Sequence, residues 1–183
     1  MFAHDIYFIC ILQQEAHLAK SPALTQCIGR GPAGFGVQTD QLPFDTLSTS
    51  KRVKALRVLC DNLAKVHKSG DEAEATRLSR ESYSELRKAW ERGVEEVLLG
   101  STVTRFDEGI STLKLKEVVV DDSDYEAVTI GMTKCSKYSG HDPAKAALLA
   151  TPHPDDLRED IQKLEDWRVS VESRKTETRK RRK

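Results

Sequence analysis

Few side chains of this sequence are candidates for catalysis or ligand binding, and the first of them are His4 and Asp5. They stand side by side in the stretch MFAHDIYFICIL, directly ahead of seven apolar residues. A secretory signal carries positive charge before its apolar core, whereas here Asp5 comes first. The run from Ile6 to Leu12 is also far shorter than the roughly 20 apolar residues of a membrane span. The stretch therefore indicates a soluble, cytoplasmic protein, in which an isolated His-Asp pair is weak evidence for a site.

The glycine-rich segment GRGPAGFGVQTDQLPF is the second place to look for chemistry, because glycines can cradle phosphate groups. A P-loop needs its glycines to end in Gly-Lys-Ser or Gly-Lys-Thr at the start of a helix, and Gly31, Gly34 and Gly36 are not followed by such a sequence. Glycine also supplies the positive φ that tight turns require. The segment therefore favours a turn or a hairpin tip over a phosphate site.

The cysteines do not form a metal-binding pattern. No C-x-x-C pair occurs, and no histidine stands at metal-ligand spacing from any of the four, which are Cys10, Cys27, Cys60 and Cys135. We therefore predict no metal site and interpret the cysteines as reduced, partly buried residues of a cytosolic protein.

The length and composition predict a single domain with a modest hydrophobic core. Of the 183 residues, 38% are hydrophobic and 32% are charged, which favours long polar helices. Basic and acidic residues balance at 29 each, but the last ten residues, RKTETRKRRK, hold seven basic residues and one acidic residue. We expect this basic tail to be solvated and disordered, with nucleic-acid contact as the less favoured alternative.

Apolar spacing of three to four residues predicts the helices that would position these side chains. The pattern indicates a helix over about 6–21, two long helices over 48–69 and 71–99, a helix over 123–138 and a last helix that begins at Pro154 or Asp155. Residues 23–30 favour a short strand, and periodicity leaves the stretch STLKLKEVVV, residues 111–120, open between strand and helix. Trp90 and Trp167 fall on apolar stripes, which favours core anchoring over base stacking.

These elements predict a mainly α protein with a small α/β remnant at the N-terminus. The two long helices are joined by only two residues, so they should pack as an antiparallel hairpin, with the C-terminal helices beside it. We divide the chain into a remnant at 1–47, the hairpin at 48–100, a C-terminal helical region at 101–173 and the basic tail at 174–183.

Four stretches together resemble the C-terminal part of bacterial AAA-family ATPases of the SMC-like and ABC-like type, the group that includes anticodon-nuclease ATPases. The stretches are FAHDIYFICILQQEA, RGPAGFGVQTDQLPFDTL, LRKAWERGVEEVLL and GMTKCSKYSGHD, so the resemblance runs over nearly the whole chain. It implies that His4 is the switch histidine that senses the γ-phosphate of ATP. Ala3 stands where the family usually has threonine.

The resemblance also implies that ATP and Mg²⁺ bind only in the longer family protein. Walker A, Walker B and signature motifs are needed for turnover, and the sequence has none of them. The chain then corresponds to a C-terminal fragment, cut just before the switch histidine, that completes a nucleotide-binding head and presents a helical module. Its expected partners are the remainder of the head or a second ATPase subunit, and it should not hydrolyse ATP alone.

Two alternatives stay open. Anticodon nucleases of this group are thought to cut tRNA with an arginine, a glutamate and a histidine, which suggests Arg87, Glu91 and His141 here. Arg87 and Glu91 stand at i and i+4 on one helix face, where they can meet, although such pairs are common on exposed helices. This metal-independent RNase would cut tRNA through proton exchange with the 2′-hydroxyl. The helical module of the first reading would instead present a surface to RNA, including tRNA, to DNA or to a protein. The third reading is a non-catalytic helical interaction protein, and none of the readings involves a membrane.

Overall fold

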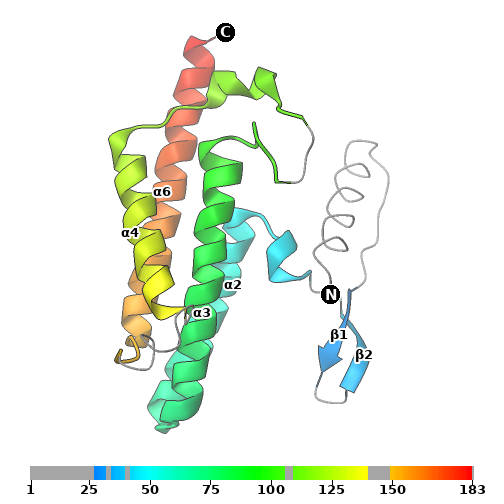
Figure 1. Ribbon diagram of the computed structural model, residues 1–183, viewed down its shortest axis with the longest axis vertical. Coiled ribbons are helices and arrows are strands. Elements are labelled where there is room, and N and C mark those ends of the chain that lie inside the picture. Colours follow the sequence, from blue (N-terminus) through cyan, green and yellow to red (C-terminus); the bar gives the residue numbers. More distant parts are fainter. Residues whose placement is uncertain (1–26, 32–33, 40–41, 106–108, 140–148, 183) are drawn as a thin grey trace. The chain divides into compact units, whose positions relative to one another are not determined.

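The computed structural model describes residues 27–31, 34–39, 42–105, 109–139 and 149–182 (Figure 1). The chain divides into two compact units, Met1–Leu47 and Ser48–Lys183, and each is described by itself. His4, the predicted helix over 6–21 and His141 lie outside the described residues.

In the first unit the described strands are β1 (Cys27–Gly31) and β2 (Gly34–Thr39), which pair in antiparallel fashion. The register shifts between Gly29 and Arg30. Residues 27–30 of the strand predicted over 23–30 are therefore confirmed, and the glycine-rich segment provides the second strand. Residues 23–26 and 32–33 lie outside the described residues. A short 3₁₀ helix, Phe44–Thr46, follows.

The second unit begins with the predicted helical hairpin, formed by α2 (Thr49–Ser69) and α3 (Glu72–Gly93). Gly70 ends α2 with a φ of 81°, a left-handed conformation that costs glycine little. The carboxylate of Asp71 caps α3 by accepting a hydrogen bond of 3.0 Å from the backbone N–H of Glu74. After Gly93 the helix widens into a π-helical turn, Val94–Leu98.

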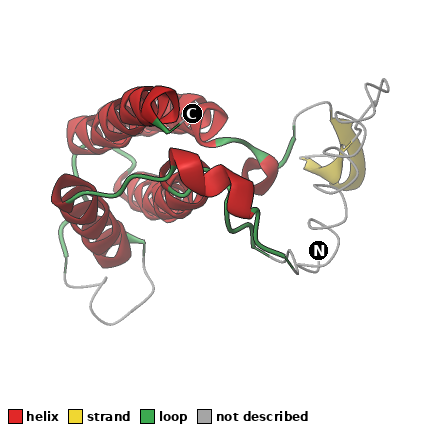
Figure 2. Ribbon diagram, turned by 90° about the horizontal axis from the view of Figure 1, so that it is seen from above, coloured by secondary structure: helices red, strands yellow, loops and turns green. Residues whose placement is uncertain are grey.

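The helices that follow complete a bundle, seen end-on in Figure 2. They are the 3₁₀ helix Thr112–Glu117, α4 (Asp122–Tyr138) and α6 (Pro154–Arg181). A capping box between Asp121 and Asp124 starts α4, and Pro154 occupies the first turn of α6. The prediction of a mainly α protein with a long hairpin and C-terminal helices is confirmed.

The core of this unit lies where α2, α3 and α6 meet. The indole rings of Trp90 and Trp167 are both buried and lie 5.1 Å apart between their centroids, as their places on the apolar stripes predicted. Tyr83 is also fully buried, and its hydroxyl donates a hydrogen bond of 2.9 Å to Asp160. The aliphatic residues of the core include Val53, Leu56, Leu63, Leu86, Leu157, Ile161, Leu164 and Val171.

The basic tail differs from the expectation. It is not a disordered end, because α6 continues through it to Arg181. Arg179 forms an ion pair of 2.8 Å with Glu117, and Lys175 donates a hydrogen bond of 3.0 Å to the carbonyl oxygen of Val97. The guanidinium of Arg182 donates to three carbonyl oxygens between residues 115 and 118. The positive charges of the tail therefore hold the segment before α4 in place.

Among the described residues, no helix combines the length and the apolar character that a bilayer crossing requires.

Candidate functional site

Arg87 and Glu91, two of the residues predicted for a nuclease, meet on the surface of α3. Their charged groups lie 3.6 Å apart, and the second oxygen of Glu91 accepts a hydrogen bond of 3.1 Å from Arg105. The Glu91 carboxylate therefore contacts two guanidinium groups, which occupy the oxygens that a general base would need to accept a proton. His141, the third predicted residue, and His4, the predicted switch histidine, lie outside the described residues.

The charged network around this pair continues toward the start of α2. Arg92 contacts both Glu95 and Glu96, at 3.2 Å each. Glu96 in turn accepts hydrogen bonds from the backbone N–H and the hydroxyl of Thr49, at 2.8 and 2.9 Å. Because Thr49 is fully buried at the first turn of α2, this carboxylate caps that helix from the π-helical turn that follows α3. The network therefore has a clear structural role in joining the two helices of the hairpin.

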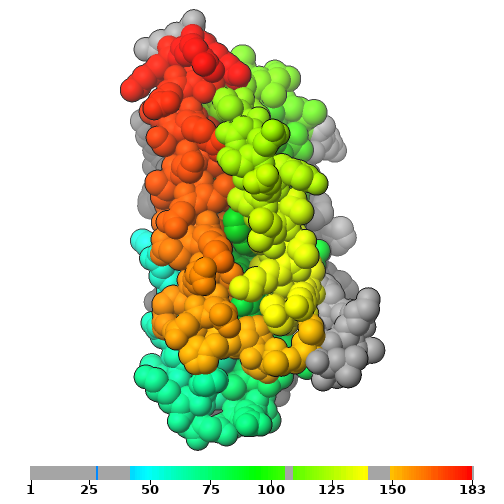
Figure 3. All heavy atoms as spheres, turned by 90° about the vertical axis from the view of Figure 1, so that its left-hand side faces the viewer, coloured from blue at the N-terminus to red at the C-terminus, as the bar shows by residue number. Residues whose placement is uncertain are grey.

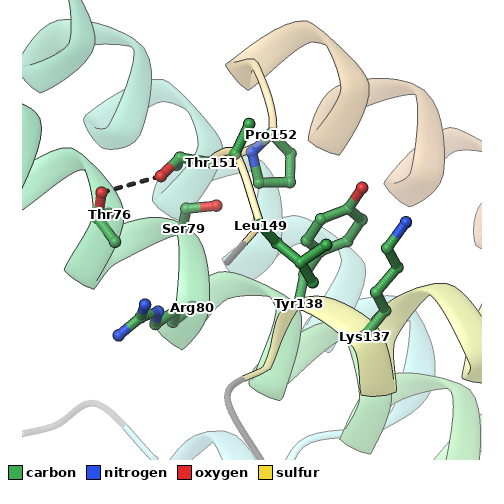
Figure 4. Close-up of a pocket in the computed structure, with 9 residues that line it drawn as sticks. Thr76, Ser79, Arg80, Lys137, Tyr138, Leu149, Thr151 and Pro152 are labelled. Carbon is green, nitrogen blue, oxygen red and sulfur yellow. Dashed lines mark hydrogen bonds between the residues drawn. The ribbon is translucent and has the colours of Figure 1, made fainter. Parts of the chain in front are cut away.

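A small pocket lies between α3, the end of α4 and residues 149–152 (Figure 4). Its volume is about 20 Å³, which suits a water molecule and excludes a substrate. Arg80 and Lys137 line it, but their charged groups point to opposite sides, so they do not converge on one anion (Figure 4). The hydroxyls of Thr76 and Thr151 bond to each other at 2.9 Å across the pocket.

A larger hollow lies between α4 and α6, with α3 beneath it, and we call it the α4/α6 groove. Figure 3 shows it as the furrow between the two outer helices, with atoms of α3 at its base. Its volume is about 450 Å³, within the range of binding pockets in general. Most of its surface is apolar, and it is lined by Leu86, Trp90, Ala127, Ile130, Gly131, Lys134, Cys135, Asp160, Lys163 and Asp166.

The floor of the α4/α6 groove depends on a glycine. A Cβ atom at Gly131 would lie only 2.4 Å from Cε2 of Trp90, so the indole occupies the place where any other residue would carry its side chain. Trp90 thereby packs directly against the backbone of α4. Ile130, the neighbour of this glycine, is 66% exposed at the rim. The groove therefore combines a buried aromatic floor with an apolar edge that faces outward.

The charged residues of the groove are mostly paired. Lys134 of α4 forms an ion pair of 2.6 Å with Asp160 of α6, and Lys163 lies 3.6 Å from the same carboxylate. Asp166 instead accepts a hydrogen bond of 2.8 Å from the amide of Gln162, and no cation within the described parts of the chain forms an ion pair with it. Among the described residues, Asp166 is thus a groove carboxylate that forms no ion pair.

Cys135 lines the floor but is not a nucleophile at neutral pH. Burial raises the pKa of its thiol to about 12, so the reactive thiolate is scarce. Within the described ranges, no three side chains of His, Cys, Asp or Glu gather as metal ligands do.

The sequence reading did not identify the α4/α6 groove. The signal that could have found it is the pair Ile130-Gly131 within an otherwise amphipathic helix, since a glycine in a helix interior often marks a close approach by a neighbour. Comparison of the chain with protein families, curated proteins and solved structures finds no match.

Proposed function

We propose that the unit Ser48–Lys183 is a non-catalytic helical interaction module and that the α4/α6 groove is its contact surface. The observation that supports this proposal is the groove itself, an apolar hollow of about 450 Å³ over Trp90 with Ile130 exposed at its rim. Apolar surface of this kind, bordered by charged side chains, is typical of protein contact sites.

The occupant that suits the groove best is a helix. The backbone groups of α4 and α6 are already bonded within their own helices, so the groove walls offer few partners to the backbone of an extended peptide. A helix satisfies its own backbone and presents apolar side chains at intervals of three and four residues. The activity proposed here accordingly needs neither ATP nor a metal ion.

The experiment compares proteins retained by the tagged full chain in extracts of cells that express it. Ile130→Lys places a charge at the groove, and Val58→Lys is a matched control, because Val58 is a similarly exposed apolar residue of α2, at 60%. We expect a defined set of proteins, which can include the chain itself, to be retained by the wild type and the control and lost with Ile130→Lys. Identical sets for all three would contradict the proposal.

The ATPase-head and nuclease readings remain predictions. The first requires His4 beside a nucleotide bound by the remainder of a head or a second subunit, and the second requires His141 beside Arg87 and Glu91. Incubating the full chain with total tRNA, beside His141→Ala and Glu91→Gln variants, tests the nuclease. Cleavage of tRNA by the wild type and by neither variant would support the nuclease and contradict the interaction module.

A further inference from the structure

We propose that the α4/α6 groove is occupied by α4 of a second copy of this chain, in a two-fold symmetric dimer. This inference rests on the proposed function, since it names the partner of the same surface. Three observations support it: the apolar residues that α4 exposes, the charges left without a counter-ion, and the direction in which the helices run.

The first observation is that α4 itself has the surface that the groove requires. Ile130 is 66% exposed on this 17-residue helix and lies on the face that lines the groove, beside Ala127, Gly131 and Lys134. Tyr125 is also exposed, but it points about 140° away from Ile130 around the helix and does not line the groove. An apolar face next to an apolar hollow is self-complementary, because the projecting Ile130 of each copy can enter the groove of the other. A two-fold interface requires this reciprocity.

The second observation concerns charge. Lys137 near the end of α4 is exposed and lies over the ring of Tyr138, 5.2 Å from its centroid. Within the described residues it forms no ion pair with a carboxylate, as Asp166 forms none with a cation. These two residues therefore provide one positive and one negative group at the same face. The chain as a whole carries no net formal charge, so two copies do not repel each other strongly.

The third observation is that the helix directions bring these charges together. Lys134 pairs with Asp160, and Trp167 donates a hydrogen bond of 3.0 Å to Asp124, so α6 runs antiparallel to α4 (Figure 1). Asp166 consequently lies beside the N-terminal half of α4. When the two-fold axis is perpendicular to α4, the two α4 helices run antiparallel, and this arrangement brings the C-terminal half of the second α4, with its Lys137, toward Asp166. One arrangement of the two copies therefore allows both the apolar contact of Ile130 with the groove and the ion pair between Lys137 and Asp166.

The test is sedimentation velocity of the full chain from about 1 to 100 µM, the range of weak to moderate dissociation constants. We expect a concentration-dependent dimer. Ile130→Lys should raise the dissociation constant by about 30-fold or more, as for a central interface residue. Val58→Lys should leave it unchanged. Circular dichroism melts establish that both variants are folded.

Charge reversal at Lys137 and Asp166 tests whether these two residues pair between the two copies, because only a direct contact lets the second reversal restore the dimer. Lys137→Glu alone and Asp166→Lys alone should each weaken the dimer by about two- to fivefold, and the double variant should restore it. A chain that stays monomeric throughout, or a dimer indifferent to Ile130→Lys, would overturn the inference. A monomer that still loses a different captured protein through Ile130→Lys would overturn the dimer and leave the proposed function standing.

Discussion

Helices α2 and α4 both pack on α3, but they do so with different chemistry. α2 buries an apolar stripe that includes Val53, Leu56 and Leu63, so its position follows from the removal of apolar surface from water. Of the 17 described residues of α4, only Asp124 and Cys135 are buried, and its large apolar side chains Tyr125 and Ile130 point outward.

The difference indicates distinct roles for the two helices. α2 belongs to the scaffold, because its apolar face is fully used inside the unit. α4 contacts α3 through a small apolar area, where Trp90 packs on Gly131 and Tyr83 packs on Tyr138, and it contacts α6 through polar groups. Asp124 accepts hydrogen bonds from Trp167 and Arg174, and Lys134 pairs with Asp160. Ile130 remains exposed, which is what a contact helix requires. Substitutions in the two helices should therefore have different effects on stability.

Leu56→Ala should have the largest effect. Leu56 is completely buried in α2, so its truncation removes apolar contacts and leaves a cavity, and we expect a loss of about 3 kcal/mol in the free energy of unfolding. Ile130→Ala is the matched change on α4 and should cost less than about 0.5 kcal/mol in the monomer, as exposed substitutions do. Urea unfolding at low protein concentration measures both. Equal losses would remove the distinction between the helices.

Asp124→Asn should lower the free energy of unfolding by about 2 kcal/mol, the scale of a hydrogen bond to a charged group. The amide oxygen can still accept from Trp167, but the charge that meets Arg174 is lost in a fully buried position. Asp122→Asn, in the exposed first turn of the same helix, serves as the control. A neutral result for Asp124→Asn would show that polar contacts do not hold α4.

Gly131→Ala should destabilise the unit by about 1 kcal/mol, since the overlap with Trp90 outweighs the better helix propensity of alanine. Gly109→Ala is the control, because a Cβ at Gly109 meets no atom within 4 Å. The readouts are the unfolding midpoint and the tryptophan emission, to which Trp90 and Trp167 both contribute. A stabilised Gly131→Ala variant would mean that α4 does not contact this indole.

The rates of thiol alkylation of Cys60 in α2 and Cys135 in α4 should distinguish the two helices. Burial raises the pKa of both Cys60 and Cys135, so both react slowly at pH 8. For Cys135 the folded state favours the protonated thiol, and this contribution to stability is present below the ordinary pKa of 9.0 and is lost as the pH rises toward about 12. Because α4 is less embedded, local opening should label Cys135 faster than Cys60, which peptide mass spectrometry measures. A faster Cys60 would contradict this comparison.

The sequence predicted the hairpin well, because its signals are local. Ser69, Gly70 and Asp71 mark the turn through backbone conformation and capping, and the apolar stripes placed Trp90 and Trp167 in the core. The prediction that the basic tail is disordered was wrong, because its partners Glu117 and Val97 are distant in sequence. The α4/α6 groove could not be predicted either, because the pattern of α4 does not reveal which apolar residues other helices will cover. Tyr125 stands at helical spacing from Val128 and Met132, and it is nevertheless 71% exposed.

Hydroxyl-radical footprinting of Ile130 and Val58 in the full chain tests most directly whether the α4/α6 groove is a contact surface, without knowledge of the partner. The two side chains are similarly exposed in the described structure, so they should be modified to similar extents in dilute purified protein. In cells that express the chain, we predict that Ile130 is protected and that Val58 is not. Equal modification of the two residues under both conditions would contradict the account.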